Sequence, residues 1–157
     1  YLEKSYCKTG SLIANSARAA GVLSCQDEKY LRLLYDFGKK LGLAFQVVDD
    51  ISDFTANDKQ LGKPAASDLA SGYLTAPALF ALEEKSSLSQ LIEREFSSEG
   101  DLEQALSLVR ESNAIEKSRE LAEKFASQSK ESLAWLPESS YKSALVELPD
   151  FVLRRLY

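Results

Sequence analysis

The sequence predicts an all-α protein, and two observations support this. Apolar residues recur at three- and four-residue steps through most of the chain, as they do along one face of a helix. No segment shows the strict apolar–polar alternation of a half-buried strand. With 157 residues, of which 45% are hydrophobic, the chain is long enough to bury a core. We therefore expect packed helices and no long disordered region.

Turn-forming residues divide this pattern into successive helices. Asn, Asp, Gly and Pro gather between residues 56 and 67 and predict a loop there. Trp135-Leu136-Pro137 predicts a break near the end of the chain. The predicted helices cover residues 1–20, 27–54, 75–84, 86–96, 101–111, 113–133 and 139–157.

Residues at the ends and on the apolar stripes of these helices predict further details. Ser24 or Asp27 is the expected N-cap of the second helix, and Asp101 is the expected cap of the fifth. Gly38 and Gly42 fall on the apolar stripe of the second helix, where each costs up to ~1 kcal/mol relative to alanine. We expect another helix to pack closely against these glycines.

Composition excludes several classes of function. The net charge is -5 and no basic run is present, so nucleic acid is not an expected partner. No apolar stretch approaches the roughly 20 residues that a membrane-spanning helix needs. The chain contains no histidine, which excludes within it Ser-His-Asp and Cys-His catalysis and the usual histidine-based zinc sites.

Two further features concern the context of the chain. Cys7 and Cys25 form neither a metal-type pair nor a disulfide framework, so we expect a soluble protein in a reducing compartment. There is no methionine and no visible targeting segment, and residues 1–6 already have a helical pattern. We therefore expect a piece of a longer protein.

Polar residues interrupt the otherwise apolar stretch 42–54. On a helix, residues three and four apart share a face. Phe45, Asp49 and Asp53 therefore line up on one stripe. Gln46, Asp50 and Asp53 line up on a second stripe. The spacing thus brings an aromatic ring, an amide and three carboxylates together on one short length of helix.

Three neighbouring carboxylates repel one another, more strongly in apolar surroundings. Such clusters at helix ends are often only solvated or capping features. The flanking residues Leu41, Val47 and Val48 indicate a buried helix, however, and buried acids need partners. Two acids one turn apart, with room for water and a phosphate oxygen, suit Mg²⁺.

Five patterns follow one another along the chain: Lys8-Thr9, Phe45-Gln46, Asp49-Asp50-Ile51-Ser52-Asp53, Gly62-Lys63 and Asp68-Leu69-x-x-Gly72-x-x-Thr75-x-Pro77. In this order and spacing they resemble the second half of a trans-type isoprenyl (polyprenyl) diphosphate synthase. Phe45-Gln46-x-x-Asp49-Asp50-x-x-Asp53 resembles that family's second aspartate-rich motif. Within the family, residues 60–65 and 74–83 resemble the long-chain branch, above all the solanesyl diphosphate synthases of plants and cyanobacteria.

The resemblance, which covers essentially the whole chain, implies a helical bundle of the isoprenoid synthase type. Two aspartate-rich motifs then face each other across a deep cavity, and their Mg²⁺ ions hold the diphosphate of an allylic substrate. Loss of that diphosphate leaves an allylic cation, which isopentenyl diphosphate attacks. The implied activity is that of a prenyltransferase that makes a longer trans-polyprenyl diphosphate, and it needs no histidine base.

The same resemblance implies roles for individual residues. Asp49 would be the principal Mg²⁺ ligand, Asp53 would act through water or as a second ligand, and Asp50 would support the ligands. Among the implied substrate-binding and catalytic residues, Lys8 and Lys63 would contact the allylic diphosphate. Thr9 and Gln46 would place their oxygen dipoles near the cation. Phe45 would line the pocket for the incoming substrate.

The chain departs from the family pattern in two ways, of which the first concerns only one extra diphosphate contact. Tyr73 stands where many members have a lysine. The first aspartate-rich motif and the arginines that bind isopentenyl diphosphate belong to the other half of the family's fold. We therefore expect residues 1–157 to be the C-terminal part of a single synthase domain and to be inactive by themselves.

A non-catalytic alternative remains open on these grounds. A regulatory subunit that binds an active partner would share the same fold, and the intact Asp49, Asp50 and Asp53 argue against it without excluding it. By resemblance, the expected assembly is a homodimer or a heteromer with a related subunit. The expected location is a plastid or the cytoplasm of a cyanobacterium.

Overall fold

The computed structural model of the chain describes residues 1–55 and 66–156, and these residues form helices and turns but no strand. The all-α prediction is therefore confirmed. The described residues divide into two compact units, one comprising Tyr1 and residues 49–120 and the other residues 2–48 with the chain from Leu121. Among the described helices, none is long and apolar enough to cross a membrane.

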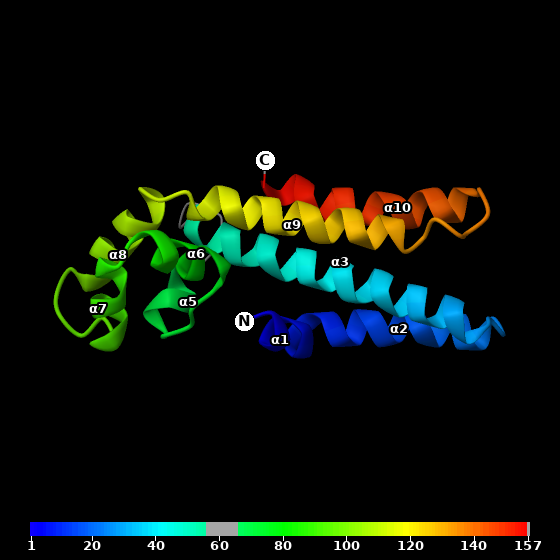
Figure 1. The fold of residues 1–157 in the computed structure, drawn as a ribbon, viewed down its shortest axis with the longest axis horizontal. Coiled ribbons are helices and arrows are strands. Elements are labelled where there is room, and N and C mark those ends of the chain that lie inside the picture. Colours follow the sequence, from blue (N-terminus) through cyan, green and yellow to red (C-terminus); the bar gives the residue numbers. More distant parts are fainter. Residues whose placement is uncertain (56–65, 157) are drawn as a thin grey trace. The chain divides into compact units, whose positions relative to one another are not determined.

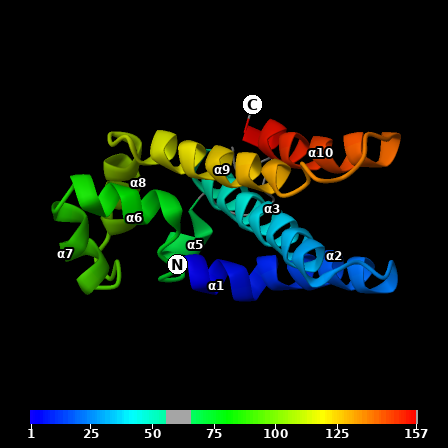
Figure 2. The same cartoon turned by 45° about the vertical axis from the view of Figure 1, so that its right-hand side comes forward.

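The second unit is a layer of long helices. The chain enters it through α1 (Leu2–Ser5), a short π-helical segment η1 (Tyr6–Gly10) and α2 (Ser11–Leu23). The long helix α3 (Glu28–Thr55) follows and belongs to this unit up to Val48. The layer is completed by α9 (Ala114–Glu131), which belongs to it from Leu121, and by α10 (Ser140–Leu153) and the 3-10 turn η2 (Arg154–Leu156). Figures 1 and 2 show α3 between α2 and α9, with α10 beside α9.

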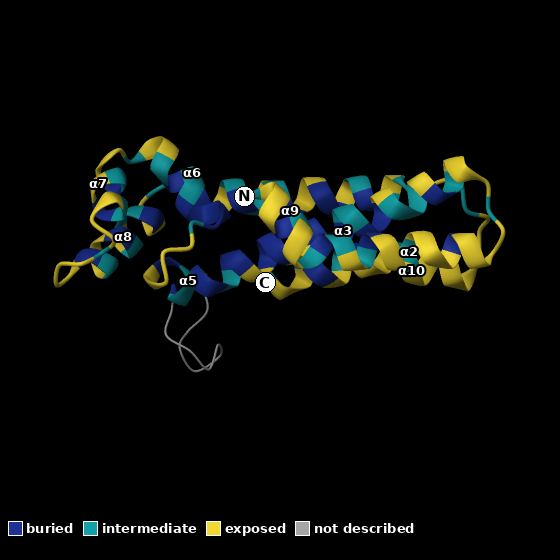
Figure 3. Ribbon diagram, turned by 90° about the horizontal axis from the view of Figure 1, so that it is seen from below, coloured by how far each residue is buried: buried dark blue, intermediate teal, exposed yellow. Residues whose placement is uncertain are grey.

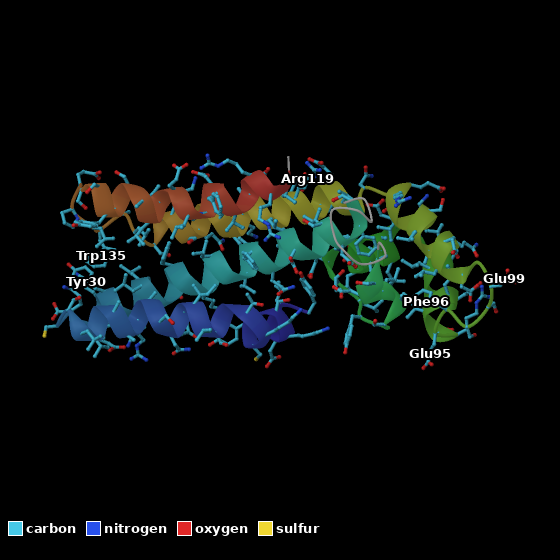
Figure 4. All side chains as sticks on the ribbon, turned by 180° about the vertical axis from the view of Figure 1, so that it is seen from behind. Tyr30, Glu95, Phe96, Glu99, Arg119 and Trp135 are labelled. Carbon is cyan, nitrogen blue, oxygen red and sulfur yellow. The ribbon has the colours of Figure 1, made fainter. Side chains whose placement is uncertain are left out.

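One polar and one aromatic contact hold the helices of this layer together. The Ser129 hydroxyl of α9 donates a hydrogen bond to the Phe37 carbonyl of α3 at 3.0 Å, and both residues are buried. At the far end of the layer, the rings of Tyr30 and Trp135 stack with their centroids 4.2 Å apart (Figure 4). These contacts join α3 to α9 and to the turn that leads into α10.

The two glycines of α3 explain how closely α2 and α3 approach each other. A Cβ atom added at Gly38 would lie 2.5 Å from the Ile13 carbonyl oxygen. A Cβ added at Gly42 would lie 2.6 Å from the Gly10 Cα. Both distances are far below van der Waals contact, so only glycine fits at these positions. The close packing that the sequence predicted for this stripe is confirmed.

The boundary between the first two helices differs from the prediction. α2 continues to Leu23, and Ser24 ends this helix instead of beginning the next. The Ser24 hydroxyl donates to the Ala20 carbonyl at 2.9 Å, and Cys25 follows with a left-handed φ of 53°. The Asp27 carbonyl accepts the first main-chain hydrogen bonds of α3. Asp27, the other residue predicted as N-cap, is therefore the one at which this helix begins.

The first unit surrounds a smaller apolar core. It contains α5 (Ser67–Ala70), α6 (Ala76–Glu84), α7 (Ser87–Glu93) and α8 (Asp101–Arg110). Figure 3 shows the buried positions of α5 and α6. Pro77 near the start of α6 fits a helix start because it lacks the N–H that would have no partner there. The core of this unit consists of Phe54, Ala66, Leu69, Ala78, Ala81, Leu88, Leu91, Ala105, Val109 and Ala114.

α7 ends earlier than predicted, in a Schellman turn. The Phe96 N–H donates to the Leu91 carbonyl at 3.1 Å, and the Glu95 N–H donates to the Ile92 carbonyl at 2.9 Å. Glu95 and Phe96 both have positive φ, at 55° and 53°, and they lie at the end of this helix in Figure 4. Glu95 thus holds the position at which glycine is usual.

Asp101 does not cap α8 as predicted, because Gly100 is the N-cap and Asp101 lies in the first turn. The Asp101 carboxylate accepts hydrogen bonds from the Arg94 guanidinium, at 2.7 Å from Nε, and from the Ser98 N–H at 3.1 Å. The hydrogen bond from Arg94 lowers the pKa of Asp101, as does the one from Ser98. The residue therefore closes the turn between α7 and α8.

The close approach of η1 to α3 yields a stability prediction. We expect Gly42→Ala to lower the free energy of unfolding by ~1–3 kcal/mol, because the new Cβ meets the Gly10 backbone. Gly21→Ala is the matched control, since its Cβ would meet only the side-chain ends of Leu31 and Leu34, which can shift. Urea unfolding followed by circular dichroism compares the two variants. An equal loss of stability in the two variants would contradict a backbone contact at Gly42.

Candidate functional site

The polar residues of α3 separate into a buried stripe and an exposed stripe. Gln46, Asp50 and Asp53 are only 5%, 2% and 2% exposed. Phe45 is 38% exposed, and Asp49 is also exposed. The spacing correctly predicted that Gln46, Asp50 and Asp53 share a face, but it did not predict this difference in burial. Buried polar groups need hydrogen-bond partners, and the structure provides one for each member of the buried stripe.

Gln46 receives a hydrogen bond from Thr9 of η1. The Thr9 hydroxyl donates to the Gln46 Oε1 at 2.7 Å. The hydroxyl hydrogen is used in this bond, so the orientation of the Thr9 oxygen is fixed and its lone pairs point away from Gln46. The two residues, which the sequence predicted to act together, are therefore in direct contact although they are 37 positions apart.

The turn that carries Lys8 and Thr9 is π-helical, a feature that the sequence pattern did not predict. The Ser11 N–H bonds to the Tyr6 carbonyl, one residue further back than in an α-helix. The Cys7 carbonyl accepts the Ser11 hydroxyl at 3.1 Å. Lys8 is exposed in this turn. Single π turns of this kind occur often at functional sites.

Tyr6 anchors the same turn to α3. Its hydroxyl is hydrogen-bonded to the Tyr35 hydroxyl, and Lys39 lies over its ring at 5.3 Å from the centroid. The hydrogen bond with Tyr6 raises the pKa of Tyr35, and burial raises it further. The spacing of residues along one helix could not predict the contact between Tyr6 and Tyr35, because it joins two different helices.

The two buried aspartates bind separate parts of the chain. The Tyr1 hydroxyl donates to the Asp50 Oδ2 at 2.6 Å. The Asp53 carboxylate accepts the Ser67 hydroxyl and the Asp68 N–H, each at 3.2 Å. Asp53 therefore holds the first turn of α5, where a negative charge is favourable. Asp68, which belongs to the last of the five sequence patterns, contributes its main-chain N–H to this contact.

The exposed stripe is covered in part by the end of the chain. The Arg155 guanidinium lies over the Phe45 ring, 5.0 Å from its centroid, which is within the range of a cation–π contact. Arg154 instead forms an ion pair with Glu147 at the surface. The two adjacent arginines thus contact different neighbours.

The chemistry of the carboxylates fits Mg²⁺. In residues 1–55 and 66–156, no group of three or more His, Cys, Asp and Glu side chains is arranged as a metal cluster. Mg²⁺ does not need such a cage, because it keeps several waters and binds through one or two carboxylates and substrate phosphates. Asp49 is the exposed carboxylate of the three. Lys63, the remaining predicted site residue, lies outside the described residues.

The helical layer, the Lys8-Thr9 turn and the aspartates of α3 are features of isoprenoid synthases, a class of all-α proteins. A family model for polyprenyl synthetases matches residues 1–109. The chain belongs to this family, and the resemblance inferred from its motifs is confirmed.

Similar proteins agree with the family assignment. A prenyl transferase of Synechocystis is 57% identical over all 157 residues, which are 49% of its own length. The chloroplastic solanesyl diphosphate synthase 2 of Arabidopsis thaliana is 48% identical over 99% of this chain and 37% of that protein. A polyprenyl synthase from Caulobacter crescentus, complexed with calcium and isoprenyl diphosphate, is 34% identical and superposes with a TM-score of 0.85 over 98% of this chain and 48% of that one. The chain thus spans about half the length of such curated relatives as the prenyl transferases of Synechocystis and Cyanophora paradoxa.

The contact between Thr9 and Gln46 yields a second prediction. We expect Thr9→Val to lower the free energy of unfolding by ~1–3 kcal/mol, because the buried Gln46 oxygen loses a donor. Thr55→Val is the control, since the exposed Thr55 hydroxyl donates, within the part of the chain that the structure describes, to Ile51 of the same helix at 3.1 Å. Chemical denaturation should show about 0.5 kcal/mol or less for that control. Equal stability of the two variants would contradict the prediction that the bond from Thr9 to Gln46 stabilises the fold.

Proposed function

We propose that the complete protein containing this chain condenses isopentenyl diphosphate with an allylic diphosphate and makes a longer trans-polyprenyl diphosphate. The observation that carries the proposal is the intact string Phe45-Gln46-x-x-Asp49-Asp50-x-x-Asp53 on α3, with its buried members hydrogen-bonded. The match of all 157 residues to about half (49%) of a prenyl transferase of Synechocystis supports it. Residues 1–157 would form the C-terminal part of a single synthase domain.

The proposed reaction begins with departure of the allylic diphosphate. Negative charge grows on this leaving group in the transition state, so positive charges placed beside it lower the barrier. Lys8 and Lys63 would contact the diphosphate as compact point charges. Asp49 would hold Mg²⁺, with Asp53 as a second or water-mediated ligand and Asp50 as a supporting group. When bound, the metal would neutralise charge on the phosphate oxygens.

Neutral groups would act on the cation that remains. Thr9 and Gln46 present oxygen atoms that can face a positive charge, and the hydrogen bond between them fixes the Thr9 oxygen. Such fixed dipoles need little reorganisation when charge develops. Phe45, whose ring is partly exposed, would line the pocket for the hydrocarbon part of the substrate.

Several features of the whole protein follow by analogy with its relatives. The Caulobacter polyprenyl synthase bound to calcium and isoprenyl diphosphate supports a divalent cation and diphosphate ligands for this chain. The Synechocystis and chloroplastic relatives support a plastid or cyanobacterial location. We extend the proposal to a homodimer or a heteromer with a related subunit, and to the absence of turnover by residues 1–157 alone.

The central role of Asp49 can be tested in the complete protein. We expect Asp49→Ala to reduce the incorporation of labelled isopentenyl diphosphate by ~10²–10³-fold, because the metal that meets the leaving-group charge loses its principal ligand. Asp36→Ala is the matched control, since Asp36 is also an exposed aspartate of α3 but lies outside the motif. Undiminished incorporation by Asp49→Ala would refute the proposed function.

A further inference from the structure

One contact of the aspartate motif has no role in the proposed reaction. The Tyr1 hydroxyl donates to the Asp50 Oδ2 at 2.6 Å across 49 positions of sequence. Both residues belong to the same compact unit. Tyr1 is half-buried, whereas Asp50 is 2% exposed. A tyrosine from outside the motif therefore reaches one of its most buried carboxylates.

The chemistry of this bond makes it a strong constraint. A phenol that donates to a carboxylate forms a short, charge-assisted hydrogen bond, stronger than one between neutral groups. In a buried environment such a bond also fixes the direction of the carboxylate, because the alternatives lose the donor and gain no water. Tyr1 therefore holds Asp50 in one orientation on α3.

Asp50 is covalently adjacent to Asp49, the exposed carboxylate to which we assign the metal. A fixed Asp50 side chain restrains the turn of α3 that presents Asp49. Groups that orient a metal ligand without touching the metal typically change metal affinity by about 10–100-fold when they are removed, and Tyr1 would act on Asp49 in this way through Asp50. A residue that served only to tie the start of the chain to α3 would change stability alone.

We propose that Tyr1 is a positioning residue of the metal site, which acts through Asp50 and raises the affinity for the divalent cation. This inference rests on the proposed function, because it needs Asp49 to be a metal ligand. It concerns binding of the metal and not the chemical step, so its effect is measurable without turnover.

The test is a Mn²⁺ titration of the complete synthase in the presence of inorganic pyrophosphate, followed by electron paramagnetic resonance. Tyr1→Phe removes only the hydroxyl and should raise the Mn²⁺ dissociation constant about 10–100-fold. Tyr141→Phe is the matched control, since Tyr141 is 82% exposed on α10, and it should leave the constant unchanged. An unchanged constant in Tyr1→Phe, even with lowered stability, would overturn the proposal.

Two further variants separate the possible failures. In an Asp50→Asn background the bond to Tyr1 is no longer charge-assisted, so Tyr1→Phe should change the Mn²⁺ constant by less than about threefold. A full effect in that background would show that Tyr1 does not act through Asp50.

Asp49→Ala should weaken Mn²⁺ binding by itself. If it does not, the metal assignment under the proposed function fails, whereas loss in Asp49→Ala with no change in Tyr1→Phe refutes only the role of Tyr1.

Discussion

The structure depends on one constraint, which is that α3 buries a stripe of polar side chains. Gln46, Asp50 and Asp53 lie in a helix whose neighbouring residues form the core, and each would destabilise the fold if it lacked a hydrogen-bond partner. The partners come from the π turn through Thr9, from Tyr1, and from the first turn of α5. The motif that we assign to the chemistry therefore also decides where distant segments attach to α3.

A second constraint acts through shape instead of charge. Gly42 and Gly10 meet backbone to backbone, so η1 approaches α3 more closely than side chains would permit. The π turn begins one residue after α1 ends and carries Lys8 and Thr9 within it. Close approach and the π turn together place the Thr9 hydroxyl within hydrogen-bond distance of Gln46. The glycines on the apolar stripe thus serve the site as well as the packing.

Periodicity predicted what is local to one helix. The extent of α3, the shared face of Gln46, Asp50 and Asp53, and the close packing at its glycines all follow from spacing within that helix. The motifs also predicted the family, which the family model confirms. The π turn, in which the Ser11 N–H bonds to the Tyr6 carbonyl, was not predicted because the apolar pattern does not mark the change of hydrogen-bond step. The link from Tyr1 to Asp50 was not predicted either, because it joins residues 49 positions apart. A single sequence carries no signal for such pairs.

The central claim is that Asp49 presents its carboxylate to a metal while the buried stripe holds α3 in place. It is tested most directly by a crystal structure of the complete synthase with Mn²⁺ and an allylic diphosphate analogue, with the metal located by anomalous scattering. We expect a metal ion about 2.1 Å from an Asp49 carboxylate oxygen, with Asp50 still hydrogen-bonded to Tyr1. A metal ion held without Asp49, or an Asp50 side chain that has turned away from Tyr1 to bind it, would contradict the account.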